Sequence, residues 1–260
     1  LFNAGICKYQ GRYAMVFRND YGAKNGEEFL ARQARDEPRF DGTNLGLAFS
    51  DDGIDWKVEP RPCITLEQAK KLIIPIMRSQ DPEMHLQRFY DPRLTVLDGR
   101  VYMCFAIDTN QGLRGGVAVT DDFENWEVLS ASLPDNRNMV LFPEKVNGLY
   151  CRFERPVNTN GGTWFSGDQA QMWWSASTDL RFWGDAQHIL GTFDLEWGND
   201  KMGPGAPPIK TSEGWLTTFH AVWRDDSRGK HGWEEKWPKV YRAGLMLMDL
   251  EHPWKIKALR

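Results

Sequence analysis

The sequence predicts an all-β protein built as a β-propeller, and three observations lead to this fold class. Four segments end alike, in an aspartate-containing turn followed by tryptophan: SDDGIDW at Trp56, TDDFENW at Trp126, STDLRFW at Trp183 and MDLEHPW at Trp254. Each is preceded by an apolar run typical of a strand, and further upstream by a hairpin turn that contains glycine. Four-stranded sheets repeated radially hide most of their edges, which is the principle of a propeller.

Each repeat contains the same expected elements in the same order. A first strand leads into a turn with glycine, which permits the positive φ of a tight hairpin; the turns are Gln10-Gly11, Asp98-Gly99, Asn147-Gly148 and Glu213-Gly214. The second strands are expected at Tyr13–Phe17, Val101–Ile107, Leu149–Phe153 and Trp215–Phe219, and the third at Asn44–Ser50, Gly116–Thr120, Gln171–Ser177 and Arg242–Met248. Short outer strands such as Lys57–Glu59 and Glu127–Leu129 follow the tryptophans. A β-sandwich is the alternative, but it leaves the recurring turn and tryptophan unexplained.

Four insertions interrupt the repeats. The segment Tyr21–Asp41 is charged and carries a short predicted helix at Glu27–Arg35. Thr65 and Gln68 form a capping-box pattern that opens a second helix reaching to about Ile74. Two polar segments, Val157–Gln169 and Asp225–Lys239, are expected to be exposed loops. Long loops on a rigid scaffold are where binding residues concentrate.

Bulk composition narrows the function classes. The chain has 260 residues, a net charge of -4 and 12 tryptophans, so it lacks the clustered positive charge of a nucleic-acid-binding protein. No apolar run approaches the roughly 18 residues of a membrane span, and the sequence does not open on a basic-then-apolar signal segment. Because Leu1 is not an initiator, a signal upstream of it stays open. Its four cysteines form no CxxC pair. We therefore expect a cytoplasmic protein, 1–260 forming a single catalytic domain, without metal or organic cofactor and without nucleic-acid or membrane partners; a homo-oligomer stays open.

Polar residues at the ends of the expected inner strands are the candidates for chemistry. Asp91, in RFYDPRLTVLDGR, comes just ahead of the predicted strand Leu94–Leu97 and is the first candidate, although it could simply cap a turn before Pro92. The other candidates, taken in chain order, are Asn3, Arg18, Tyr90, Arg137, Asn138, Arg155, Lys201, His220 and Tyr241. One acid therefore accompanies several cations. Glycosidases that use water need two carboxylates, whereas arginine forks and a lysine suit phosphate, so the pattern favours phosphorolysis.

The same residues carry a family resemblance. NAG near the start, YDPR, NRN followed by LFPEK, Arg155-Pro156, KMGPGAPPIKTSEGW, His220 and YRAGLMLMDLEHP resemble, in order, the motifs of glycoside hydrolase family 130. That family comprises β-mannoside phosphorylases and related β-mannosidases, and its members are five-bladed β-propellers. The resemblance implies an inverting phosphorylase that cleaves β-mannosides, such as β-1,4-mannosyl-glucose or β-manno-oligosaccharides, with inorganic phosphate as co-substrate and releases α-mannose 1-phosphate.

The resemblance also implies a role for each candidate. Asp91 is implied as the general acid, delivering its proton through the 3-hydroxyl of the mannosyl unit. The implied phosphate-binding residues are Arg137, Arg155, Lys201, His220 and Tyr241. The implied sugar-binding residues are Asn3, Arg18, Tyr90 and Asn138.

Two departures from the family pattern and two alternative functions stay open. The chain carries about four of the five expected blades, so it is either a fragment or a propeller that closes differently, and Tyr21–Asp41 is longer than expected. One alternative is a β-mannosidase, against which Arg137, Arg155 and Lys201 argue. The other is a non-catalytic glycan-binding propeller that uses the tryptophans Trp164, Trp173, Trp233 and Trp237.

Overall fold

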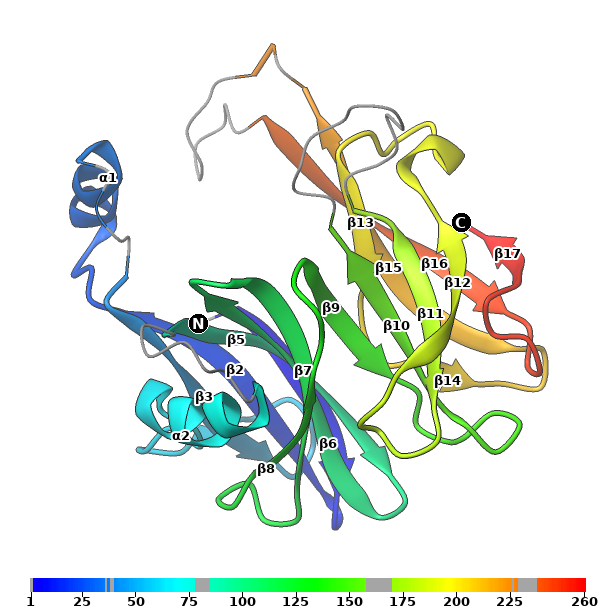
Figure 1. The fold of residues 1–260 in the computed structure, drawn as a ribbon, viewed down its shortest axis with the longest axis horizontal. Coiled ribbons are helices and arrows are strands. Elements are labelled where there is room, and N and C mark those ends of the chain that lie inside the picture. Colours follow the sequence, from blue (N-terminus) through cyan, green and yellow to red (C-terminus); the bar gives the residue numbers. More distant parts are fainter. Residues whose placement is uncertain are drawn as a thin grey trace. The chain divides into compact units, whose positions relative to one another are not determined.

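A computed structural model describes residues 2–35, 37, 40–77, 85–157, 170–225, 227–228 and 238–260 of the chain. These residues form two compact units, which we call unit 1 (Leu1–Pro134) and unit 2 (Asp135–Arg260). Each unit contains two antiparallel sheets and its own apolar core (Figure 1).

Unit 1 holds two four-stranded sheets, ordered β1-β2-β3-β4 and β5-β6-β7-β8. The strands of the first sheet are β1 (Phe2–Tyr9), β2 (Arg12–Tyr21), β3 (Gly42–Ser50) and β4 (Lys57–Val58). Those of the second are β5 (Leu86–Leu97), β6 (Arg100–Thr109), β7 (Gly112–Thr120) and β8 (Glu127–Ala131). Strands β1 and β5, the first of each sheet, contact each other, so the two sheets meet along their inner strands.

Unit 2 repeats this arrangement. Its first sheet is ordered β9-β10-β11-β12, and the second β13-β15-β16-β17 with β14 added to β15. The first sheet contains β9 (Asn136–Leu141), β10 (Tyr150–Pro156), β11 (Met172–Ser177) and β12 (Gly184–Leu190). A short 3-10 helix, η1 (Thr192–Asp194), leads to β13 (Lys201–Pro204), β14 (Ile209–Lys210), β15 (Trp215–Arg224), β16 (Lys239–Met248) and β17 (Ile256–Leu259). The predicted all-β fold with four blades is confirmed.

The aspartate-containing turns explain the repeat that the sequence displays. In three of them a serine or threonine hydroxyl and an aspartate carboxylate accept the turn's backbone N–H groups; the aspartates are Asp52, Asp122 and Asp179. The next residue has positive φ, and its carbonyl accepts the indole N–H of the tryptophan that ends the repeat. Each turn thus satisfies its own polar groups locally, as side chains of this type do in turns.

The fourth turn departs from this geometry. Asp249 again accepts two backbone N–H groups, from Glu251 and His252, but one more residue separates it from its tryptophan. The Trp254 ring packs against Trp174 at 4.6 Å between centroids, while Trp215 donates its indole N–H to the Leu250 carbonyl. Trp215 therefore takes the place that the repeat tryptophan has in the other turns.

Three of the four glycine hairpin turns have the predicted geometry. Gln10-Gly11, Asp98-Gly99 and Asn147-Gly148 each have positive φ at both residues, the requirement of the tightest hairpin. Glu213-Gly214 differs, because only Gly214 has positive φ, at 155°. A Cβ at Gly214 would lie 2.3 Å from the Met248 carbonyl oxygen, so close backbone approach demands glycine there.

Both predicted helices are present. Helix α1 (Gly26–Ala34) lies in the first insertion, and α2 (Leu66–Met77) packs against β3, β5 and β8. The capping box of α2 forms as expected, with the Gln68 side chain accepting the Thr65 N–H at 2.8 Å and the Thr65 hydroxyl accepting the Gln68 N–H at 3.2 Å. Helix α2 runs past the predicted end, through Pro75. The expected loops at 158–169 and 229–237 lie outside the described residues.

Candidate functional site

Three inner strands carry the same local distortion. Asn3 in β1, Asp91 in β5 and Asn138 in β9 have φ of 51°, 55° and 57°, and each lies where the register of its strand pair shifts. Asparagine and aspartate tolerate this left-handed conformation better than other residues with a side chain. A bulge of this kind re-aims a side chain while the strand continues.

These bulges correct the predicted positions of the candidates. Asp91 does not precede a strand at Leu94–Leu97 but lies inside β5, which begins at Leu86. Asn138 likewise lies within β9 rather than ahead of Met139–Phe142. In sequence, Asp91 followed by Pro92 is a typical turn signal. In the structure the pairing of β5 with β6 resumes beyond these two residues.

Asp91 is held by residues of two other strands in unit 1. Asn3 donates its side-chain N–H to Asp91 Oδ1 at 2.8 Å, and Arg18 NH1 lies 3.4 Å from the same oxygen. Two residues on, burial lowers the pKa of Arg93, a shift that the charge of Asp91 opposes. The Asp91 side chain is 16% exposed, so a reactant can reach it.

Arg18 is bound more closely by Asp20 than by Asp91. Arg18 lies within β2, not after it, and its Nε is 2.9 Å from both Asp20 carboxylate oxygens, while NH2 is 2.6 Å from Oδ2. The Thr43 hydroxyl, from β3, donates to Asp20 Oδ1 at 2.5 Å. The exposed fractions of the Arg18 and Asp20 side chains are 9% and 2%. Two opposite charges are therefore buried as one hydrogen-bonded pair.

Tyr90 is fixed by a second aspartate, Asp108, whose side chain is 29% exposed. Its hydroxyl donates to Asp108 Oδ1 of β6 at 2.6 Å, and Arg88 Nε lies 2.9 Å from Asp108 Oδ2. The guanidinium carbons of Arg88 and Arg18 lie 4.4 and 5.0 Å from the Tyr90 ring centroid. Unit 1 thus brings together all four of its predicted site residues. We call Asn3, Arg18, Tyr90 and Asp91 the acid cluster.

Sequence reasoning missed Asp20 and Asp108. A signal for Asp20 was available, because Arg18 and Asp20 are two residues apart in a strand and so share one face. Asp108 has no such signal, since its partners Arg88 and Tyr90 come from the neighbouring strand.

Unit 2 gathers the predicted cations. Arg155 of β10 is 2% exposed and is the direct cross-strand partner of Arg137 in β9. Its NH1 lies 3.4 Å from His220 Nε2 of β15 and 3.5 Å from the Met202 carbonyl oxygen. We call Arg137, Arg155, Lys201, His220 and Tyr241 the cation cluster; Asn138 follows Arg137 in β9.

Lys201 shows how strongly positive this cluster is. Its pKa is lowered to about 8, first by burial and then by the charges of Lys239, Arg155 and Arg137. Its Nζ lies 5.5 Å from the ring centroid of Tyr241, which in turn lies 6.1 Å from the ring of His220. An anion bound nearby would stabilise the protonated form of a lysine whose pKa is lowered in this way.

Gly203 in the KMGPGAPPIK motif makes room for the cluster. A Cβ there would lie 2.9 Å from His220 Cε1 and 3.0 Å from Arg155 NH1. His220 and Gly203 are direct partners in the pairing of β15 with β13. The glycine thus allows both side chains to cross the face of the strand.

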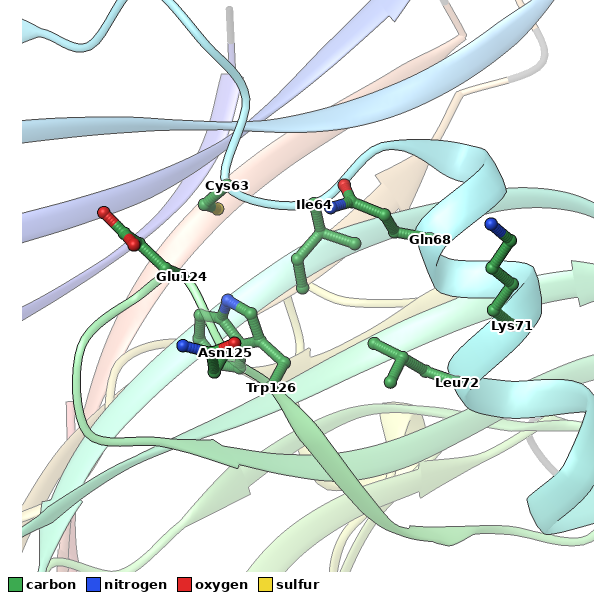
Figure 2. A pocket seen from close by; sticks show the side chains of 8 residues that line it. All are labelled: Cys63, Ile64, Gln68, Lys71, Leu72, Glu124, Asn125 and Trp126. Carbon is green, nitrogen blue, oxygen red and sulfur yellow. The ribbon is translucent and has the colours of Figure 1, made fainter.

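A separate cavity of about 240 Å³ in unit 1 contains none of the predicted site residues (Figure 2). It lies between α2 and the turn that ends at Trp126, and its lining residues are Cys63, Ile64, Gln68, Lys71, Leu72, Glu124, Asn125 and Trp126. Burial raises the pKa of the Cys63 thiol to about 12, so this thiol is not reactive. All four cysteines are free.

Within the described ranges, no group of three His, Cys, Asp or Glu side chains is arranged to hold a metal ion. No described helix has the length and hydrophobicity to cross a bilayer. Of the tryptophans proposed to bind glycans, Trp173 packs its ring on His188 at 5.4 Å, and Trp164, Trp233 and Trp237 lie outside the described residues.

A family model and several curated relatives match this chain over most of its length. The model of glycoside hydrolase family 130, described as beta-1,4-mannooligosaccharide phosphorylase, matches residues 39–259. The chain is 34% identical to a beta-1,4-mannooligosaccharide phosphorylase of Ruminococcus albus, over 99% of this chain and 66% of the relative. It is 31% identical to a 1,2-beta-oligomannan phosphorylase of Thermoanaerobacter sp., over 99% of this chain and 72% of the relative.

A solved structure has the same fold. The beta-1,2-mannobiose phosphorylase from Listeria innocua superimposes with a TM-score of 0.68 at 23% identity, covering 99% of this chain and 74% of that one. The chain spans about two thirds of the length of the Ruminococcus albus relative.

Proposed function

Because this chain belongs to glycoside hydrolase family 130, we propose that it acts as an inverting β-mannoside phosphorylase. Inorganic phosphate attacks the anomeric carbon of the mannosyl unit, forming a C–O bond to phosphate. The glycosidic C–O bond breaks, and its oxygen takes up a proton as the acceptor sugar leaves. The products are α-mannose 1-phosphate and the shortened saccharide.

The observation that carries this proposal is the cation cluster. Two arginines that face each other across β9 and β10, and a lysine whose pKa their charges help to lower to about 8, suit a multiply charged anion. Hydrolysis by a carboxylate pair gives no reason for such an accumulation. Arg137, Arg155, Lys201, His220 and Tyr241 are accordingly assigned to phosphate.

In the same proposal the acid cluster handles the sugar and the proton. Asp91 is assigned as general acid, with its proton passing through the 3-hydroxyl of the mannosyl unit. Asn3 and Arg18, which contact Asp91, are assigned to the sugar together with Tyr90 and Asn138. The relatives are named for β-1,4 and β-1,2 linkages, so substrates of both kinds belong in the test.

The test is incubation with β-1,4-mannobiose, β-1,2-mannobiose and mannosyl-glucose, with and without phosphate. Mannose 1-phosphate that forms only with phosphate supports the proposal. Free mannose at the same rate without phosphate identifies a mannosidase instead, and binding without turnover identifies a glycan-binding protein. Asp91→Asn is expected to abolish product, while Asp98→Asn, at the exposed turn after the same strand, should keep it. Full activity of Asp91→Asn contradicts the assignment of the acid.

A further inference from the structure

Asp20 and Asp108 occupy matching positions in the two blades of unit 1. Asp20 follows Arg18 by two residues in β2, and Arg18 pairs with the residue just before the β1 bulge. Asp108 follows Ala106 by two residues in β6, and Ala106 pairs with Tyr90, just before the β5 bulge. Both aspartates therefore lie two residues beyond the bulge on the second strand of their blade.

Each aspartate also binds the same two kinds of donor. Asp20 accepts the Thr43 hydroxyl and binds the guanidinium of Arg18. Asp108 accepts the hydroxyl of Tyr90 and binds Arg88. The buried carboxylate of Asp20 thus binds Arg18, and the partly exposed carboxylate of Asp108 binds Tyr90, two residues of the acid cluster.

Arg18 has two carboxylates within reach, and they differ in closeness. Its contacts with Asp20 measure 2.6 and 2.9 Å, whereas Asp91 lies at 3.4 Å. A buried guanidinium that lacks its partner exerts a strong field, because the surroundings screen it poorly. An acid next to such a charge is held in the ionised form.

Charged and titratable groups from several elements lie in or next to the acid cluster. Strand β2 supplies Arg18 and Asp20, β5 itself supplies Arg88 and Arg93, and β6 supplies Asp108 and Cys104. Among these, Arg18 makes the direct contact with the Asp91 carboxylate. The charge balance of the Arg18 and Asp20 pair therefore has a direct influence on whether Asp91 can hold a proton.

We propose that Asp20 is a positioning residue that orients Arg18 and cancels its charge, so that Asp91 can carry the proton it delivers to the departing sugar. The delivery of that proton rests on the proposed function. The cancellation of charge does not, and it can be measured without turnover.

The decisive experiment follows the titration of the Asp91 carboxyl by ¹³C NMR, with the signal identified by its loss in Asp91→Asn. Four proteins are compared: wild type, Asp20→Asn, Arg18→Met and the double variant Arg18→Met/Asp20→Asn. The pair has net charge zero in the wild type and in the double variant, positive in Asp20→Asn and negative in Arg18→Met. The expected order of midpoints is therefore Asp20→Asn lowest, wild type and double variant close together, and Arg18→Met highest.

An opposite charge at this distance is expected to lower the Asp20→Asn midpoint by at least about one pH unit. The same midpoint in Asp20→Asn and wild type overturns the inference. If Asp20→Asn does not fold, the comparison of Arg18→Met with the double variant decides, since equal midpoints there also overturn it. Asp121→Asn removes the carboxylate of a more exposed bidentate pair, with Arg100, and should leave the midpoint unchanged.

Activity supplies a second readout. The alkaline limb of the pH profile of kcat/KM is expected to move to lower pH in Asp20→Asn and to stay in place in Asp121→Asn. A loss of activity without such a displacement indicates a structural role alone and contradicts the inference. If the wild type does not use phosphate at all, the proposed function fails, while the order of midpoints still decides the role of Asp20.

Discussion

Arg155 and Arg137 are direct partners in the antiparallel pairing of β10 with β9. Like charges directly opposite each other in a sheet destabilise the folded state. Lys201 adds a third positive group, since both arginines help to lower its pKa. The fold therefore maintains a repulsion that a bound anion would relieve.

Phosphate should raise the thermal stability of the wild-type protein, because a ligand that binds the folded state stabilises it by about 2.7 kcal/mol at a hundred times its Kd. Arg137→Met should lose most of this rise and, without phosphate, should be at least as stable as the wild type. The measurement is Tm across a phosphate titration at constant ionic strength. Lys255→Met, at an exposed lysine near β17, is the matched control and should keep the full rise. A full phosphate effect in Arg137→Met contradicts a role for this arginine.

Phosphate affinity should decrease as the pH rises through about 8. Lys201 has its pKa lowered from 10.5 to about 8, so the free protein loses this charge near pH 8, while a bound anion favours the charged form. At pH 8 and above inorganic phosphate is mostly the dianion, so its own titration does not cause the decrease. In Lys201→Arg the charge persists, and the decrease should disappear. Calorimetric Kd values between pH 7 and pH 9.5 provide the measurement, and parallel pH dependence in both proteins would contradict it.

The same shift has a consequence for stability without phosphate. Between pH 8 and 10.5 the unfolded chain keeps the Lys201 proton that the folded chain has released. The contribution of Lys201 to the free energy of unfolding therefore increases with pH in this range. The cost of the buried charge is present in full below about pH 8. The free energy of unfolding of Lys201→Met should therefore exceed that of the wild type by most below pH 8, and this difference should decrease toward pH 10.5.

The blades were predictable from sequence because their signal is local. The hydrogen bonds that close each turn join residues within a few positions of one another, as in the turn from Thr120 to Trp126. The starts of the inner strands were not predictable in the same way. Asp91-Pro92 has the composition of a turn, and only pairing with β6, formed by distant residues, keeps it inside a strand.

The residues of the candidate site were likewise predictable only in part. The types of residue at the ends of the predicted strands, and their order, indicated Asp91, Arg155 and Lys201, because one acid stands among several cations at these positions. The partner of Tyr90 was not visible, since its contact with Asp108 spans two strands. Whether these residues act as the family resemblance implies stays a prediction.

Asp122→Ala should destabilise the protein by about 1 kcal/mol, as the loss of a comparable capping side chain does. Asp122 accepts the backbone N–H groups of Glu124 and Asn125 and the side-chain N–H of Asn125, and these bonds lower its pKa to about 2. Asp51→Ala is the control, because Asp51 is almost fully exposed and lies 4.0 Å from Arg12. Urea unfolding followed by tryptophan fluorescence measures both. Equal effects in the two variants would show that the turn does not depend on the aspartate.

Gly5→Ala should impair both stability and mannoside turnover, because the backbone of β5 lies too close to Gly5 of β1 to leave room for a Cβ. A Cβ at Gly5 would lie 2.8 Å from the Leu94 nitrogen and 2.9 Å from both Arg93 Cα and the Pro92 carbonyl oxygen. These are backbone atoms directly after the bulge that holds Asp91, and they cannot move without moving it. Overpacking of this kind costs about 1–3 kcal/mol.

The control for Gly5→Ala is Gly26→Ala, since a Cβ at Gly26 would meet no atom within 4 Å. It should change the free energy of unfolding by less than about 0.5 kcal/mol and leave kcat/KM as in the wild type. Gly5→Ala is expected to lower kcat/KM even at temperatures where it is fully folded, because the displaced bulge misplaces the Asp91 carboxylate. A Gly5→Ala protein with wild-type kcat/KM would mean that Asp91 does not depend on the contact between β1 and β5 for its position.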